Sequence, residues 1–144
     1  MSALTGHCHC GAIQASLEPA GDLLSMPYRA CQCGFCRRHG ARTTSHPDAW
    51  VHLVAAPGSV RRYRFGRRSV DAVLCRECGV YVGSVLASGD RLFSTINVAG
   101  LNLPGFEGRV AEHKVYDDET DEQRLARRLA RWSPSTLVET VPSA

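Results

Sequence analysis

The 144-residue sequence lacks the features of several protein classes. No apolar run approaches the roughly 20 residues that a membrane-spanning helix needs. Residues 1–10 (MSALTGHCHC) have neither the basic start nor the apolar stretch of a secretory signal peptide, which favours a cytoplasmic protein. The 13 glycines and 7 prolines follow no period, which argues against a collagen-like or low-complexity chain.

An excess of charge of one sign is also missing. The 17 basic and 14 acidic residues leave a formal net charge of +3, so the overall charge does not indicate a nucleic-acid-binding protein. Lysine is nearly absent, since Lys114 is the only one, and this bias towards arginine favours a GC-rich bacterial genome. Length and composition predict one globular domain over residues 1–144, with its core over about 6–116.

Cysteine is the residue in excess. The odd number of cysteines and the lack of an export signal argue against a disulfide framework. Clustered thiols without an export signal are more typical of metal sites or redox centres. The seven cysteines form three tight groups: Cys8 and Cys10; Cys31, Cys33 and Cys36; Cys75 and Cys78. Two Zn²⁺ ions with seven thiolates would bring the formal net charge from +3 to zero.

Short runs rich in β-branched and aromatic residues predict a mainly β fold. Turn signals such as Ala56-Pro57-Gly58 and Ser88-Gly89-Asp90 separate many of these runs. The predicted strands are Ala12–Leu17, Met26–Ala30, Val51–Val54, Val60–Phe65, Val70–Leu74, Val80–Val85, Arg91–Val98 and Ala111–Tyr116.

One short C-terminal helix is predicted over about residues 120–133. Thr120 and Gln123 have the spacing of a capping box, and Pro134 ends the helical pattern. Leu125, Leu129 and Trp132 form one apolar stripe, which predicts a surface helix docked on the sheet. Arg124, Arg127, Arg128 and Arg131 lie towards the negative end of the helix dipole. The last ten or so residues are expected to be frayed.

The first and last cysteine groups together fit a structural zinc site. In Cys75-Arg76-Glu77-Cys78-Gly79, the C-x-x-C turn lets both sulfurs point to one centre. Cys8 and Cys10 lie two residues apart, so in an extended chain they share a face and can supply the second pair. A redox dithiol or a pair of buried thiols is the alternative interpretation of either pair alone.

The middle group, Cys31-Gln32-Cys33-Gly34-Phe35-Cys36, packs three thiols into one loop. Three ligands would leave one coordination position open, and an open position is typical of a catalytic zinc. His39 lies three residues after Cys36 and is an alternative fourth ligand that would close the site. Spacing alone also allows other partitions of the seven thiols.

These residues resemble the glutathione-dependent formaldehyde-activating enzyme family, whose domain also occurs in centromere protein V. The resemblance is carried by Gly6-His7-Cys8-His9-Cys10-Gly11-Ala12-Ile13, by the segment from Cys31 to Ala41, and by Cys75-Arg76-Glu77-Cys78-Gly79. It covers about residues 6–116. It implies a β-tent of antiparallel sheets pinned by zinc, with two Zn²⁺ ions per chain.

The resemblance also implies the roles of the cysteines and the reaction. It implies a structural zinc on Cys8, Cys10, Cys75 and Cys78, and a catalytic-type zinc on Cys31, Cys33 and Cys36. The implied activity is that of a carbon–sulfur lyase resembling S-(hydroxymethyl)glutathione synthase, acting on a glutathione–aldehyde adduct such as S-hydroxymethylglutathione. A soft zinc–thiolate centre could accept the sulfur of such a thiol. Arg37 and Arg38 are candidates to bind its carboxylates.

A zinc-stabilised binding module without catalysis is the alternative function. Arg61, Arg62, Arg64, Arg67 and Arg68 are interleaved with Tyr63 and Phe65, a pattern that could contact a phosphate backbone. A solvated hairpin rim explains the same residues more simply, so a nucleic-acid partner is not expected. A third interpretation is a zinc protein in which the second metal only stiffens its loop.

Overall fold

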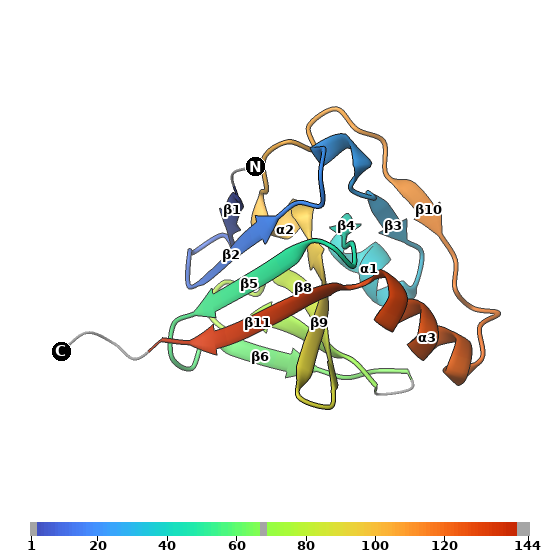
Figure 1. The fold of residues 1–144 in the computed structure, drawn as a ribbon. Helices are drawn as coiled ribbons and strands as arrows, with labels where there is room; N and C mark the ends of the chain where they lie inside the picture. The colour runs from blue at the N-terminus through green and yellow to red at the C-terminus, as the bar shows by residue number, and fades with distance from the viewer. Residues whose placement is uncertain (1–2, 67–68, 141–144) are drawn as a thin grey trace.

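The computed structural model describes residues 3–66 and 69–140. Within these ranges the chain forms a mainly β fold, as the sequence predicts (Figure 1). The strands are β1 (Leu4–His7), β2 (Ile13–Glu18), β3 (Arg29–Cys31), β4 (Thr43–Thr44), β5 (Trp50–Ala55), β6 (Val60–Tyr63), β7 (Asp71–Cys75), β8 (Tyr81–Ser88), β9 (Arg91–Asn97), β10 (Glu112–Lys114) and β11 (Ser133–Glu139). The helices are η1 (Leu23–Ser25), α1 (Gly34–His39), α2 (Val98–Leu101) and α3 (Asp121–Arg131).

The strands form one mixed sheet that forks at β9. One edge of β9 pairs with β8, which continues to β7 and β6. The other edge pairs with β11 at residues 92–94 and with β4 at Ile96 and Asn97. From this fork one branch runs β11-β5-β2-β1 and the other runs β4-β3-β10. The fork leaves Thr95 between the two branches, where it lines a cavity.

Antiparallel pairing dominates, as the resemblance implies, but two pairs are parallel. β10 pairs with β3, and β11 pairs with β5. All eight predicted ranges overlap an observed strand. β1, β4 and β11 were not predicted from the sequence.

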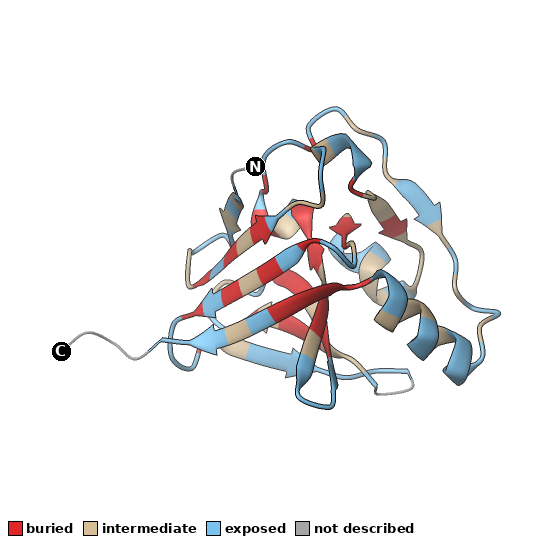
Figure 2. Ribbon diagram, in the orientation of Figure 1, coloured by how far each residue is buried: buried red, intermediate tan, exposed pale blue. Residues whose placement is uncertain are grey.

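The main core is formed mainly by side chains of β2, β5, β8 and β9. Alternation along β2 buries Ile13, Ala15 and Leu17 and leaves the intervening residues more exposed, as expected for a strand with one face on a core. Leu53 and Ile96 reach the same core from β5 and β9. Figure 2 shows the buried segments concentrated in the middle of the sheet, whereas α3 is exposed on its outer side.

The predicted capping box of α3 is confirmed. The Thr120 side chain accepts a hydrogen bond from the Gln123 backbone, and the Gln123 side chain accepts one from the Thr120 backbone. The apolar stripe is only partly buried: Trp132 packs with Leu86 and Phe93, whereas Leu125 is 45% exposed. The prediction of a surface helix docked through this whole stripe is therefore too simple.

The prediction that the last ten or so residues are frayed is wrong for residues 135–139. These residues belong to β11, which lies between β5 and β9. Residues 141–144, which the same prediction covers, lie outside the described residues. Pairing with β5 begins at Ser135, so the missing N–H of Pro134 falls before this ladder. Within the described residues no helix is long and apolar enough to cross a membrane.

Candidate functional site

Four cysteines from distant parts of the chain meet at the edge of the core. Cys8 and Cys10 lie in the turn after β1, Cys75 ends β7, and Cys78 lies in the following turn. Their four sulfurs lie within 4.8 Å of one another. The Sγ–Sγ distance is 3.8 Å between Cys8 and Cys10 and 3.6 Å between Cys10 and Cys75. The backbone N–H of Ile13 donates to the Cys8 sulfur at 3.3 Å.

The geometry of this group fits zinc. With a Zn–S bond of about 2.3 Å, the edge of a ZnS₄ tetrahedron is about 3.8 Å, close to the observed sulfur separations. Burial raises the pKa of the Cys75 thiol to about 12. Burial also acts against ionisation of Cys78, but hydrogen bonds from the backbone of Val80 and Cys10 outweigh it and lower the pKa of Cys78 to about 6. A dication bound among four thiols would stabilise all four as thiolates.

The three remaining cysteines gather at one loop. Cys31 ends β3, Cys33 caps the N-terminus of α1, and Cys36 lies in that helix. Their sulfurs also lie within 4.8 Å of one another. The Cys36 backbone N–H donates to the Cys33 sulfur at 3.4 Å. Hydrogen bonds from the thiols of Cys31 and Cys36 hold the pKa of Cys33 far below that of a free thiol. This all-sulfur donor set also suits zinc, with three protein ligands instead of four.

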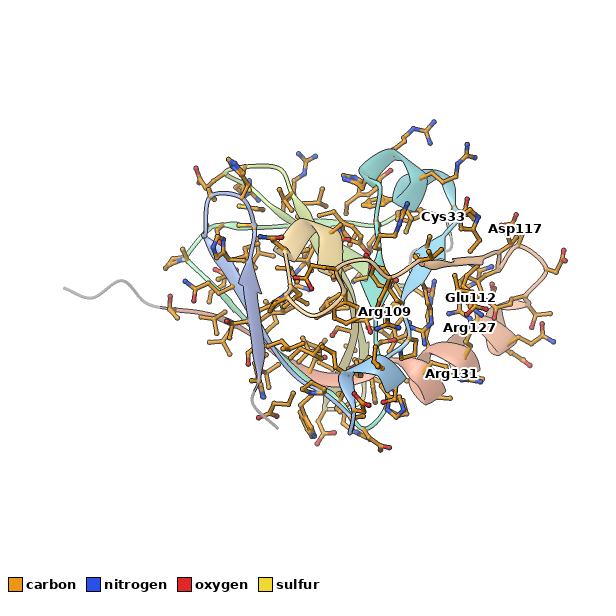
Figure 3. The ribbon with its side chains drawn as sticks, turned by 90° about the horizontal axis from the view of Figure 1, so that it is seen from above. Cys33, Arg109, Glu112, Asp117, Arg127 and Arg131 are labelled. Carbon is orange, nitrogen blue, oxygen red and sulfur yellow. The ribbon has the colours of Figure 1, made fainter. Side chains whose placement is uncertain are left out.

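A cavity of about 470 Å³ lies beside these three cysteines. Its walls come from the fork of the sheet, β3, β10, the segment before α3, and α3 itself. The sulfur-bearing residues Cys31, Cys33 and Cys36 all line it. Many of the other lining residues are polar or charged, and they include Arg29, Ser69, Tyr81, Ser84, Glu112, Lys114, Tyr116, Asp117, Arg124, Arg127, Arg128, Arg131 and Trp132. In Figure 3, the labelled residues Cys33, Glu112 and Arg127 lie toward the same end of the molecule, and all three line the cavity.

The wall contributed by α3 is held by polar and aromatic contacts. Arg127 makes a two-point contact with Glu119 at 2.7 and 3.0 Å, and its guanidinium lies 3.6 Å from the ring centroid of Tyr116. Arg124 donates to the Tyr116 carbonyl at 2.9 Å. Arg128 donates to the Ser69 hydroxyl at 3.1 Å. Three of the arginines of α3 thus hold the helix in place while they line the cavity.

The electrostatic character of the cavity is positive. Burial, and then the neighbouring guanidiniums of Arg127 and Arg124, lower the pKa of Arg128 to about 10. Burial also lowers the pKa of Arg29, and the positive charges of Arg131 and Arg127 lower it further. Such shifts mean that cationic side chains face one another with incomplete compensation. We therefore expect this cavity to bind an anionic ligand.

Tyr81 and Ser84 form a polar pair on the β8 wall. The Tyr81 hydroxyl is 2.6 Å from the Ser84 hydroxyl, and both residues line the cavity. Tyr81 is buried and packs against Cys36 and Phe35. The pair therefore places a hydrogen-bond donor close to the three-cysteine group.

The structure brings the seven predicted cysteines into the predicted four and three. His39 is not part of the three-cysteine group; its ring packs against Phe35 with centroids 4.5 Å apart. Arg37 and Arg38 are exposed and are not among the residues lining the cavity.

The basic stripe considered as a nucleic-acid contact is partly neutralised. Arg62 and Arg64 both pair with Asp71, and the Arg62 contact is 3.0 Å. The Arg64 guanidinium, and to a lesser extent that of Arg62, lowers the pKa of Asp71. Arg67 and Arg68, the other members of the stripe, lie outside the described residues. The described part of the stripe is therefore largely an ion-paired hairpin rim.

Sequence reasoning missed the cationic cavity wall. Arg29 lies two residues before Cys31, and the arginines of α3 repeat at positions i, i+3, i+4 and i+7. That spacing marks one face of a helix. It was attributed to the helix dipole, whereas the structure turns this face to the cavity.

Comparison with known proteins gives two further findings. A model of the family described as glutathione-dependent formaldehyde-activating enzyme matches residues 3–113, which include all seven cysteines but not α3. The chain is also similar to the crystal structure of a Rhodobacter sphaeroides protein, with 30% sequence identity and a TM-score of 0.56. That similarity covers 76% of this chain and 99% of the other.

Proposed function

This chain belongs to the glutathione-dependent formaldehyde-activating enzyme family, and from that premise we propose that it is a zinc-dependent carbon–sulfur lyase of the S-(hydroxymethyl)glutathione synthase type. Its substrate would be a thiol such as glutathione together with formaldehyde or another small aldehyde. A single observation carries the proposal: three cysteine sulfurs within 4.8 Å of one another line a cavity with a cationic wall. We place the reaction in the cytoplasm, where cysteines and glutathione stay reduced.

The residues divide into two proposed metal sites, giving two Zn²⁺ ions per chain. Cys8, Cys10, Cys75 and Cys78 offer four ligands and would hold a structural ion. Cys31, Cys33 and Cys36 offer three ligands and would leave one position for a substrate sulfur. A zinc ion bound there would supply a soft Lewis acid that favours the thiolate form of the substrate.

The chain's own residues would bind and orient the substrate. A guanidinium group can bind a carboxylate through two N–H groups at once, which fixes the direction of the carboxylate as well as its position. The arginines of the α3 wall would bind the carboxylates of the substrate in this way. This wall would hold the peptide part of glutathione while its sulfur points to the three cysteines. The enclosing strands and helix would limit the access of bulk water to the reacting carbon.

The proposed reaction is the addition of the thiol to the aldehyde. The thiol sulfur attacks the aldehyde carbon, a carbon–sulfur bond forms, and the carbonyl oxygen takes the proton that the thiol loses. The hydroxyl groups of Tyr81 and Ser84, 2.6 Å apart, can donate a hydrogen bond to that oxygen as its charge develops. In the reverse direction the carbon–sulfur bond breaks, the proton of the adduct's hydroxyl group returns to the departing sulfur, and the aldehyde is released.

The proposal is tested by following the thiol and the product separately. Glutathione added to the Co²⁺-substituted protein should strengthen the sulfur-to-metal charge-transfer absorption, and Cys33→Ser should abolish that change. NMR with ¹³C-formaldehyde should show exchange between glutathione and its hydroxymethyl adduct that is faster than the uncatalysed reaction. Exchange at the uncatalysed rate, with both metals bound, would contradict the enzyme assignment.

A binding module without catalysis remains the alternative function to test. The ion pairs of Arg62 and Arg64 with Asp71 make its nucleic-acid form less favourable. Binding to DNA or RNA that weakens steeply with salt would support it.

A further inference from the structure

We infer that Arg29, Arg128 and Arg131 form an anion-binding subsite through which the cavity selects thiols that carry at least two carboxylate groups. The inference rests on the proposed function, because it concerns the part of the substrate that lies away from the reacting sulfur. Two of the three arginines belong to α3, which lies outside residues 3–113. Substrate selection would therefore depend on a segment beyond the part of the chain that the family model matches.

The orientation of α3 is the first support. Its four arginines lie on one helical face and all line the cavity. Leu125 of the same helix is 45% exposed. A helix that served only to cover the sheet would bury its leucine and direct its arginines to water. Here the charged face points to the cavity instead.

The distribution of ion pairs is the second support. Lys114 is compensated by Glu112 at 2.7 Å, and Arg124 and Arg127 both lie against Glu119. For Arg29, Arg128 and Arg131, by contrast, residues 3–66 and 69–140 provide no carboxylate within ion-pair distance. Three cations therefore line one cavity without a carboxylate partner in ion-pair contact among the described residues.

An unpartnered hydrogen-bond donor on Arg128 is the third support. The Nε atom of Arg128 is buried and has no hydrogen-bond partner in the described structure. Among the described residues, the Ser69 hydroxyl is the only group that accepts a hydrogen bond from the Arg128 guanidinium. A buried donor that lacks an acceptor is costly, so this Nε atom favours binding of an acceptor group next to it. A carboxylate of the ligand fits both the positive charge of the guanidinium and its geometry, in which two N–H groups can donate to one carboxylate.

The charge pattern points to a dicarboxylate. A single carboxylate would leave most of this positive charge uncompensated, whereas two can be shared among three guanidiniums. Asp117, also on the cavity wall, has no ion pair in the described residues and offers an acceptor for an ammonium group. Two carboxylates and one ammonium are the charges of glutathione at neutral pH.

The test separates this subsite from the chemistry at the cysteines. S-methylglutathione keeps both carboxylates but has no free thiol, and its diethyl ester has the same skeleton without the carboxylate charges. Calorimetric titration of the zinc-loaded protein should show that the diacid binds at least tenfold more tightly than the diester. Its affinity should also fall with added salt, whereas that of the diester should change little.

Two variants and one control locate the effect. Arg128→Gln and Arg131→Gln should each weaken binding of the diacid about tenfold and leave binding of the diester unchanged. Arg131 is exposed, so its substitution tests the subsite even if the half-buried Arg128 proves necessary for folding. Arg91→Gln is the matched control, because Arg91 is an exposed arginine outside the cavity lining.

The outcomes distinguish the two proposals. Equal affinity for diacid and diester, or no binding of the diacid at 10 mM, would overturn the subsite. So would variants that behave like Arg91→Gln. Selective binding of the diacid without any spectral response of the cobalt protein to glutathione would support the subsite and count against the lyase. A spectral response of equal strength to glutathione and to uncharged 2-mercaptoethanol would support the thiol site but overturn the acid selectivity.

Discussion

The two cysteine groups use the same side chain in opposite surroundings. The four-cysteine group joins the turn after β1 to the end of β7, and two of its members are buried at the edge of the core. The three-cysteine group occupies one short loop and lines a cavity. The first can complete a tetrahedron with protein ligands alone, whereas the second cannot. From ligand number and sequence separation we therefore expect a metal in the first group to stabilise the fold and a metal in the second to meet a substrate.

The largest expected effect is on folding. Cys78→Ser should leave the protein mostly unfolded at 25 °C, because its group links Cys10 to Cys75, 65 residues away. Structural zinc binding contributes about 10–16 kcal/mol in zinc-finger peptides, as much as the net stability of a domain. Far-UV circular dichroism with urea titration measures the loss. A stable, cooperative Cys78→Ser protein would erase the distinction between the two groups.

A second variant tests the other side of the comparison. Cys33→Ser should lower the free energy of unfolding by no more than about 1–2 kcal/mol, since its group closes only a short loop. Thiol binding should nevertheless fall by more than 100-fold. Thermal melts and cobalt spectra of the same sample provide both readouts. Destabilisation equal to that of Cys78→Ser would mean that the second metal is also structural.

Metal removal should separate the groups in time. Protein purified without chelator should contain two zinc ions, and a chelator should remove one of them much faster than the other. The faster ion should come from the three-cysteine group, which has fewer ligands and opens on the cavity. Elemental analysis of wild type and Cys33→Ser checks this, since the variant should lack the fast phase. Two ions lost at the same rate would contradict the proposed difference in access.

The smallest effect concerns the wall of the cavity. Glu119→Gln should cost about 1 kcal/mol, because it removes the ion pair with Arg127. The Arg127 guanidinium lowers the pKa of Glu119, so this stabilisation is fully present above the ordinary glutamate pKa of about 4.3. It should disappear as the pH falls through the lower pKa of the folded state. Urea titrations of both proteins from neutral to acidic pH should therefore converge at low pH.

Several features of the fold and of the cysteine groups could be predicted because they depend on residues close together in the sequence. The capping box at Thr120 and Gln123 was found where expected, and so was the alternation in β2. The partition of the cysteines followed from ligand arithmetic and from the family resemblance. These signals depend on neighbours a few residues apart, or on a rare residue type that is easily counted.

The missed features depend on distant partners. β11 begins Ser133-Pro134-Ser135, a poor strand sequence, and it is ordered by pairing Ser135 with Val51, 84 residues earlier. Arg37 and Arg38 directly follow Cys36 in the sequence and are exposed outside the cavity lining, and their proposed role in binding carboxylates stays a prediction. The spacing of the α3 arginines was visible, yet only the fork at β9 determines that their face meets a cavity. The sequence therefore predicted the two cysteine groups better than the residues that line the cavity.

The junction of α3 with β11 has a consequence for how this protein could change over evolution. β11 is secured in the middle of the sheet by ladders to β5 and β9, and both ladders begin after α3 has ended. The side chains of α3 can therefore change without disturbing the pairing of β11. Substitutions on the face of α3 that lines the cavity would change the charge of the cavity, and so its ligand, while the strands and all seven cysteines stay in place.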